Sequence, residues 1–309
     1  FCIRGQYWGR LFNQAIINMM VVLGLNLLSG YLGLLNVGAV GMVAMGAYTT
    51  ALLATKFGVP MIVGMVLSIF TGVIIGVALG GPCLRLKGIY LVLMTQAFAE
   101  IVRTMLTNLT PITGGAIGVK SIPSFSFFGF ELSSTTQQYV FFLSPLIIAV
   151  LAVWRVTHSK WGRVFLAIKD NDESVATCGI NITVIKIKAF IIAAILACIA
   201  GSMYSGMAGY IAPNDFSGDL GTRYILMMMV GGWSNVFGSL LGAALVTILP
   251  EILKVLGDYY WAAFYSIVFV MAIIMPRGLV SLFMKGKTFN FDAFAKAVGF
   301  KKHKRRVSA

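Results

Sequence analysis

Glu100 is the only acidic residue well inside an apolar stretch of this sequence. Arg103 follows three positions later, and that spacing places both side chains on one face of a helix, where they can form an ion pair. An ionisable side chain inside a membrane is energetically costly and suggests a function, which here would be the relay of a proton or a cation. Arg103 can neutralise the carboxylate, however, and no second acid is placed to receive a proton. We favour a structural pair and keep ion coupling through Glu100 as the alternative.

Other residues of catalytic or metal-binding type are too sparse to form a site. The two histidines lie far apart, and none of the four cysteines belongs to a CxxC pair or shows a spacing typical of disulfides. The sequence also lacks a GxxxxGK[ST] run, the loop whose backbone amides bind the phosphates of ATP. We therefore expect a chain with no catalytic residues, no metal and no cofactor of its own.

The composition indicates that lipid surrounds most of the chain. Of 309 residues, 59% are hydrophobic and 11% are charged, with a mean hydropathy of +0.90. Soluble domains carry about a quarter charged residues, and a membrane-spanning helix takes about 20. Apolar stretches on this scale lie at about 11–29, 31–55, 60–82, 88–107, 139–154, 187–210, 223–250 and 260–281. The predicted fold is all-α, a polytopic bundle of transmembrane helices.

The net charge of +14 is concentrated in the segments that we expect to face the cytoplasm. Lys and Arg gather in the loop 155–186 and in the tail that begins near Lys285, and cytoplasmic segments retain such residues. We therefore expect a transmembrane domain over 1–284, with the cytoplasmic loop 155–186 inside it. A basic cytoplasmic tail is expected over 285–309.

Charge also predicts two broken helices. Three apolar stretches separate the loop from the tail, so one of them must turn back for both to share a side of the membrane. The stretch 223–250 is the candidate, because glycines in its first half weaken a helix. Arg4 and Arg10 suggest a cytoplasmic N-terminal end, and Arg85 and Lys87 mark another cytoplasmic joint. Three apolar stretches lie between them, so the same count predicts a break in the glycine-rich stretch 30–46.

Transporters often bind substrate beside broken helices at matching positions of two halves of the fold. Irregular backbone at membrane depth is tolerated only beside protein or a water-filled cavity. The runs 30–33 and 231–233 could form such a pair, although glycines can also serve close helix packing. On the first interpretation, we expect the translocation path to include Tyr31, Asn36, Tyr48, Gly231, Gly232 and Trp233.

The loop 155–186 mixes apolar and charged residues in a pattern typical of short amphipathic helices, with a break expected at 170–172. Asp172 is placed to cap a helix that starts just after it, and Gly179 to end that helix. Anionic lipid headgroups would repel Asp170, Asp172 and Glu173. We therefore expect the loop to dock a soluble partner.

Ordered stretches over nearly the whole chain resemble one family. They are 30–33, 46–49, 84–90, 98–103, 113–115, 162–181, 200–201 and 231–243. On these residues the chain resembles the permease subunits of branched-chain amino acid ABC importers, in particular the member of the pair with a long loop in mid-chain. It departs from the family pattern at 34–36 and at 233–235, so the resemblance implies no specific contact at those positions.

The resemblance implies a non-catalytic transport subunit of a bacterial inner membrane that imports branched-chain, hydrophobic amino acids. The implied partners are a second homologous permease, two cytoplasmic ATP-binding subunits that hold ATP and Mg, and a periplasmic substrate-binding protein. It also implies a coupling helix within 162–181, seated on an ATPase subunit. The coupling residues would be Gly162, Arg163, Ala167, Asp170, Asp172, Ala176 and Gly179. Relatives also carry urea, amides and other amino acids, so the substrate stays open, as do an ion-coupled transporter and a passive channel.

Overall fold

A computed structural model of the chain describes residues 2–83, 86, 88–127, 130–131, 134–274 and 278–279. Over these residues nearly all regular structure is helical, which confirms the predicted all-α class. The exception is a small antiparallel hairpin of β1 (Ser126–Phe127) and β2 (Phe130–Glu131), in which Ser126 lies opposite Glu131. The predicted tail 285–309 lies outside the described residues.

Seven helices of the described chain are long and apolar enough to cross a membrane. The first is α1 (Cys2–Leu25), continued by the π-helical turn η1 (Asn26–Tyr31). The others are α2 (Ala39–Phe57), α3 (Met61–Cys83), α4 (Ile89–Asn108), α6 (Thr135–His158), α9 (Ile182–Ala208) and α11 (Val236–Leu253). The helix α12 (Tyr260–Ile274) is apolar but shorter. Short connecting turns are α5 (Thr110–Thr113), η2 (Gly115–Ile117), η3 (Pro213–Phe216) and η4 (Lys254–Tyr259).

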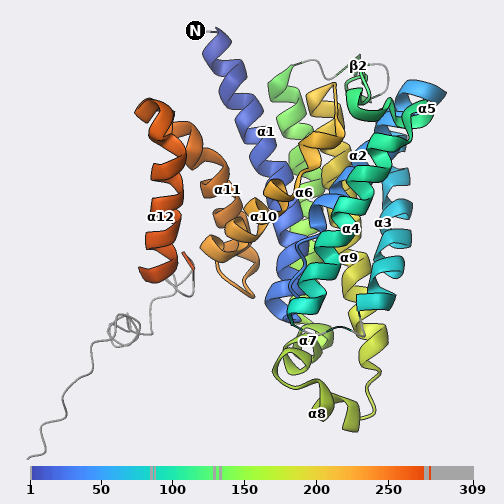
Figure 1. The fold of residues 1–309 in the computed structure, drawn as a ribbon, viewed down its shortest axis with the longest axis vertical. Helices are drawn as coiled ribbons and strands as arrows, with labels where there is room; N and C mark the ends of the chain where they lie inside the picture. Colours follow the sequence, from blue (N-terminus) through green and yellow to red (C-terminus); the bar gives the residue numbers. More distant parts are fainter. Residues whose placement is uncertain are drawn as a thin grey trace, which may run out of the picture.

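The two ends of the bundle differ in what they carry. At one end α7 (Lys160–Asp170) and α8 (Asp172–Thr177) project beyond the long helices, and we call this the loop end (Figure 1). The N-terminal end of α1 lies at the other, far end (Figure 1). The helices α1, α2 and α3 therefore cross once each, and the predicted location of the N-terminal end beside the loop was wrong. Two arginines, Arg4 and Arg10, are a small part of a charge bias that is summed over all loops.

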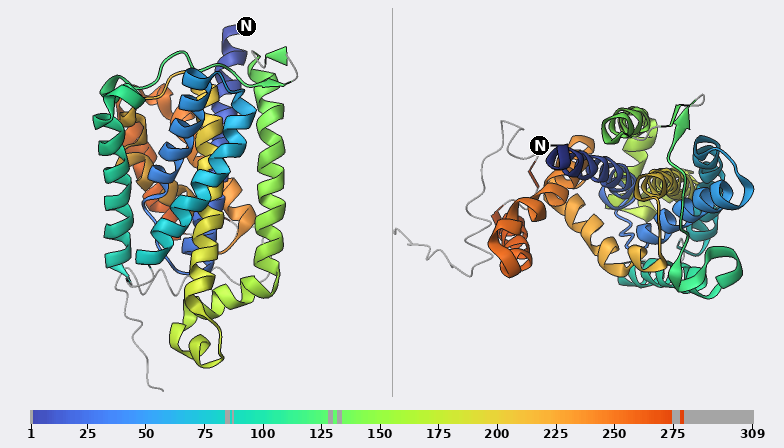
Figure 2. Two further views of the ribbon diagram at one scale, coloured as in Figure 1. Left: turned by 90° about the vertical axis from the view of Figure 1, so that its right-hand side faces the viewer. Right: turned by 90° about the horizontal axis from the view of Figure 1, so that it is seen from above.

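The stretch 223–250 forms two helices that turn back on each other, as predicted. The helix α10 (Gly218–Gly231) begins partway along the bundle and runs toward the loop end, and α11 returns toward the far end after a turn at 232–235 (Figure 1). Gly231 and Gly242 let the two backbones touch, because a Cβ at either position would collide with backbone atoms of the other helix. Seen from above, α12 lies at one edge of the molecule, beyond α10 and α11 (Figure 2).

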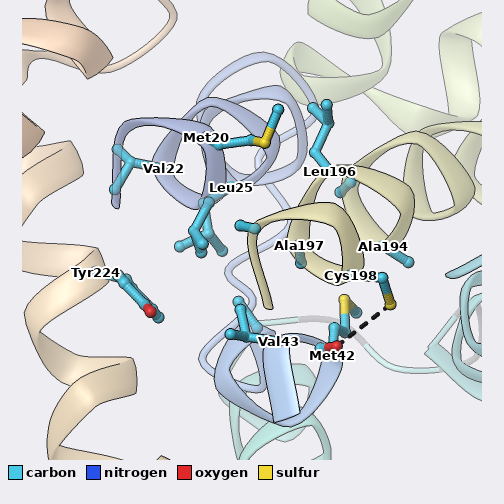
Figure 3. Close-up of a cluster of buried hydrophobic side chains, with 14 of the residues drawn as sticks. Met20, Val22, Leu25, Met42, Val43, Ala194, Leu196, Ala197, Cys198 and Tyr224 are labelled. Carbon is cyan, nitrogen blue, oxygen red and sulfur yellow. Dashed lines mark hydrogen bonds between the residues drawn. The ribbon is translucent and has the colours of Figure 1, made fainter. Parts of the chain in front are cut away.

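The core centres on α9, which packs against α1, α2 and α3. Figure 3 shows buried side chains of α1, α2 and α9 meeting there, with the Cys198 thiol donating to the Met42 carbonyl oxygen over 3.3 Å. A Cβ at Gly46 would collide with the backbone of Cys198. Gly41 and Gly46 therefore serve close packing inside a continuous helix, and the break predicted for 30–46 is confined to 32–38.

Candidate coupling site and cavity

Asn26 joins the end of the first spanning helix to the α10–α11 turn. Its side chain is 2% exposed. Its Nδ2 donates to the carbonyl oxygen of Asn235 over 2.8 Å and to the hydroxyl of Ser239, and its Oδ1 accepts from the amide of Ser234 over 2.9 Å. A buried polar group left without a partner costs about 1–3 kcal/mol. The carboxamide thus holds two breaks in the helical structure against each other.

The α10–α11 turn itself has an unusual backbone. Gly232 has a φ of +116° and Ser234 a φ of +58°. Positive φ is readily adopted by glycine and only uncommonly by serine. The Ser234 hydroxyl donates to the carbonyl oxygen of Gly30 over 2.6 Å, and Asn235 caps α11 by accepting from the amide of Gly238 over 3.1 Å. The turn is therefore held at both of its ends.

The loop reaches the same place through Lys169, near the end of α7. Its ammonium group donates to the carbonyl oxygen of Gly30 over 2.7 Å and approaches the hydroxyl of Ser234 at 3.4 Å. Its methylene chain lies over Gly33, which has a φ of +72° and where a Cβ would come within 3.1 Å of the lysine Cγ. We call Asn26, Gly30, Lys169, Ser234 and Asn235 the break junction, because two helix breaks and the projecting loop meet there.

Local sequence explains how α7 and α8 hold their positions. Ser159 caps α7 by accepting from the amide of Trp161 over 3.1 Å. Phe165 and Ile168 are buried beneath the helix. Gly162 is also buried, and a Cβ there would collide with the carbonyl oxygen of Thr157. These contacts fix α7 against the end of α6.

The break expected at 170–172 is observed, but Asp172 is not the cap. Asn171 caps α8, accepting from the amides of Glu173 (2.9 Å) and Ser174 (3.2 Å). Asp172 is the first residue of α8, and one of its carboxylate oxygens lies 2.7 Å from the ammonium of Lys186. That ion pair ties α8 to the start of α9. Gly179 follows α8 with a φ of +76°, the left-handed backbone that ends many helices.

The predicted coupling residues separate into two groups by exposure. Gly162 is buried and Asp172 is half-buried, so both serve the internal structure of the loop. The exposed members are Arg163, Ala167, Asp170, Ala176 and Gly179. Trp161 and Leu166, which the sequence analysis did not single out, add exposed apolar surface to α7. The outer surface of the loop therefore combines both charges with apolar side chains.

The predicted path residues do not form one site. Tyr31, Gly231 and Gly232 are buried and Trp233 is about a third exposed, all four beside the break junction in sequence. Asn36 is buried, with its Oδ1 accepting from the amide of Gly38 over 3.0 Å.

Tyr48 lies away from the junction. Its ring centroid is 6.1 Å from that of Phe216, which belongs to η3, and its hydroxyl has no hydrogen-bond partner among the described residues.

Glu100 and Arg103 form a pair on α4. The Arg103 Nε donates to both carboxylate oxygens of Glu100 at 3.1 Å, and its Nη2 contacts the same carboxylate. Its Nη1 also donates to the side-chain oxygen of Asn214 over 3.3 Å. The Glu100 side chain is about half exposed and points away from the packed interior.

A cavity of about 430 Å³ lies between α1, α10, α11 and α12, toward the far end. Its lining includes charged residues of both signs, and none of the predicted path residues is among them. The sequence analysis missed it because its charges stand near the ends of apolar stretches, where topology alone accounts for them. Asn18 and Asn26 lie within an apolar stretch of the sequence, and these two polar residues could have been used to predict buried polar contacts.

A multi-pass helical bundle with a re-entrant helix pair and a projecting amphipathic loop is an architecture typical of membrane transport subunits. The family model described as branched-chain amino acid transport system, permease component, matches residues 8–275. The chain belongs to that family. It is accordingly a permease of an ABC-type transport system, a non-catalytic component.

Similar curated proteins agree with the family. The chain is 29% identical over 292 residues to the high-affinity branched-chain amino acid transport system permease protein LivM of Salmonella typhimurium, covering 87% of this chain and 69% of that protein. The Escherichia coli LivM is 29% identical, over 86% of this chain and 68% of that protein. The autoinducer 2 import system permease protein LsrC of Yersinia pseudotuberculosis is 25% identical, over 71% of this chain and 60% of that protein. No solved structure matches the chain.

Proposed function

We propose that this chain moves branched-chain amino acids into the cytoplasm as one permease half of an importer in a bacterial inner membrane. Its partners would be a second homologous permease, two cytoplasmic ATP-binding subunits and a periplasmic substrate-binding protein. ATP and Mg would bind on the ATPase subunits alone. The LivM proteins support this substrate over that of LsrC, because they match the chain at higher identity and over more of its length.

The break junction carries the mechanistic part of the proposal. Lys169 stands on the helix whose outer surface is exposed for docking, and its ammonium binds the carbonyl oxygen of Gly30. Gly30 in turn accepts from Ser234 of the α10–α11 turn. A displacement of α7 by an ATPase subunit would therefore pull on both helix breaks at once. In many transporters such breaks form the substrate site, around which the two halves of the fold move during transport.

Co-purification with the ATPase subunits tests the docking step. The variants Ala167→Glu and Ala176→Glu place a carboxylate on exposed positions of α7 and α8. They suit this purpose better than a change at Gly162, which is buried against Thr157 and where a side chain would disturb the loop itself. Ala116→Glu is the matched control, an exposed alanine in η2 on the connection from α4 to α6.

We expect wild-type chain and the Ala116→Glu control to retain the ATPase subunits on purification from membranes, and the two loop variants to lose them. Retention by both loop variants would place the docking surface elsewhere. Absence of any ATPase subunit from the well-folded wild-type complex would contradict the importer assignment.

A further inference from the structure

The cavity between α1, α10, α11 and α12 presents opposite charges to one space. Arg223 of α10 lies over the ring of Trp261, with its guanidinium carbon 4.5 Å from the ring centroid. Over the part of the chain that the structure describes, no carboxylate lies within ion-pair distance of Arg223. Within the described residues, Arg223 is thus a cation of the cavity lining that contacts an aromatic ring and no carboxylate.

An acidic group lines the same space. Asp215 of η3 uses one carboxylate oxygen to accept from the amide of Ala212 over 2.8 Å, and within the described chain it pairs with no cation. A second acid, Glu251, is already paired with Lys254 at 2.8 Å. Among the described lining residues, Asp215 and Arg223 are therefore the charged groups of opposite sign that no ion pair occupies.

The rest of the lining is suited to a small solute with an apolar side chain. Ile17, Val43, Met227 and Val246 supply an apolar wall. The volume of about 430 Å³ falls in the range of pockets for single small molecules, about 300–1,000 Å³. An uncharged sugar-like solute would leave both charges unpaired, and desolvating an unpaired charge is costly.

We propose that this cavity binds the transported solute as a free α-amino acid zwitterion before it reaches the break junction. The guanidinium of Arg223 binds the α-carboxylate, Asp215 binds the α-ammonium, and the apolar wall holds the branched side chain. The cavity lies toward the far end, opposite the loop, so it would receive the amino acid from the side of the binding protein. This assignment rests on the proposed import function for the choice of solute.

Direct binding to the full-length chain in lipid nanodiscs tests the site without any other subunit. The probe is radiolabelled L-leucine, with competition by isoamylamine, which lacks the carboxylate, and by 4-methylpentanoate, which lacks the ammonium. The variants are Arg223→Gln and Asp215→Asn. Asparagine retains the oxygen that accepts from Ala212, so Asp215→Asn removes charge while it keeps the turn capped.

Two further variants separate charge from folding. Arg223→Lys keeps the positive charge and should keep part of the affinity, whereas Arg223→Gln should not. Lys56→Gln is the matched control, because Lys56 is an exposed cation outside the cavity that donates to the carbonyl oxygen of Pro111 over 2.8 Å.

We expect saturable leucine binding to wild type and to Lys56→Gln, and a loss of at least about tenfold in affinity for Arg223→Gln and for Asp215→Asn. Neither single-charge analogue should compete effectively. Absence of saturable binding to wild type, wild-type affinity in both charge variants, or equal competition by either analogue would overturn the proposal. This assay needs no ATPase. If leucine does not bind but the ATPase subunits still co-purify, the binding-site proposal is wrong and the importer assignment stands. If leucine binds but no ATPase subunit co-purifies, the importer assignment is wrong and the binding site stands.

Discussion

The ammonium group of Lys169 lies 2.7 Å from the carbonyl oxygen of Gly30, although the two residues are 139 positions apart in the chain. Lys169 belongs to the projecting helix α7, and Gly30 to the π-helical turn that ends the first spanning helix. The last carbonyls of a helix have no partner within it, so they are free to accept from elsewhere. The Lys169 side chain therefore links the projecting loop to the membrane-embedded helix break.

Replacing Lys169 by methionine should uncouple ATP hydrolysis from transport. Methionine keeps much of the apolar length over Gly33 but loses the hydrogen bond to Gly30. Coupling free energies of about 1–3 kcal/mol correspond to changes of about 5–150-fold, so we expect at least about a fivefold drop in leucine transported per ATP. The measurement is uptake and hydrolysis by the same purified complex. Lys160→Met, an exposed lysine at the start of α7, should leave the ratio unchanged.

Replacing Asn26 by leucine should destabilise the chain. The substitution leaves the amide of Ser234 without its buried acceptor, whereas the carbonyl oxygen of Asn235 loses Asn26 but still accepts from the amide and hydroxyl of Ser239. We expect the free energy of unfolding to fall by about 1–3 kcal/mol, measured by denaturant titration in detergent. Asn108→Leu, at the exposed C-terminal end of α4, is the control. Equal stability of the Asn26 variant and wild type would show that the junction is not held by this side chain.

Two glycine-to-alanine changes should differ sharply. A Cβ at Gly46 would collide with the backbone of Cys198 on α9, whereas a Cβ at Gly81 of α3 meets nothing within 4 Å. Overpacking of this kind costs about 1–3 kcal/mol, so Gly46→Ala should lower the thermal unfolding midpoint while Gly81→Ala leaves it near that of wild type. Similar midpoints for the two variants would contradict the close α2–α9 packing.

Neutralising Glu100 separates the importer from the ion-coupled alternative. Its carboxylate is held by Arg103 and is about half exposed, away from the cavity lining. We expect Glu100→Gln to retain leucine uptake within about twofold, since exposed ion pairs contribute only about 0–1 kcal/mol. Uptake should also persist when a protonophore is present and ATP is kept constant. Loss of uptake in both conditions would favour proton coupling through Glu100.

Sequence patterns predicted the large features well, for physical reasons. The lipid environment requires long apolar helices, so the eight stretches could be read directly from composition. The count of membrane crossings between the loop and the tail placed the turn in 223–250, because the loop carries a large excess of basic residues. The same reasoning failed for the N-terminal end, where Arg4 and Arg10 supplied too little charge to decide.

The contacts of the site could not be read in the same way. The runs 30–33 and 231–233 were paired as a hypothesis, and the structure brings the two breaks together, but Lys169 and Asn26 were not foreseen as the residues that join them. In the sequence, membrane topology already explains a lysine in a basic loop. Only the fold shows that Lys169 lies beside the carbonyl oxygen of Gly30. The capping role expected of Asp172 belongs to Asn171, since either residue type caps a helix and only geometry chooses.

The most direct test of the central claim is leucine uptake into proteoliposomes that contain this chain, its second permease and the two ATPase subunits, with the binding protein on the substrate side. No proton or sodium gradient is imposed. We predict that leucine accumulates only when ATP and Mg reach the ATPase subunits, and that Ala167→Glu abolishes the accumulation while Ala116→Glu does not. Uptake by liposomes that lack the ATPase subunits, or uptake that requires an ion gradient, would contradict the account.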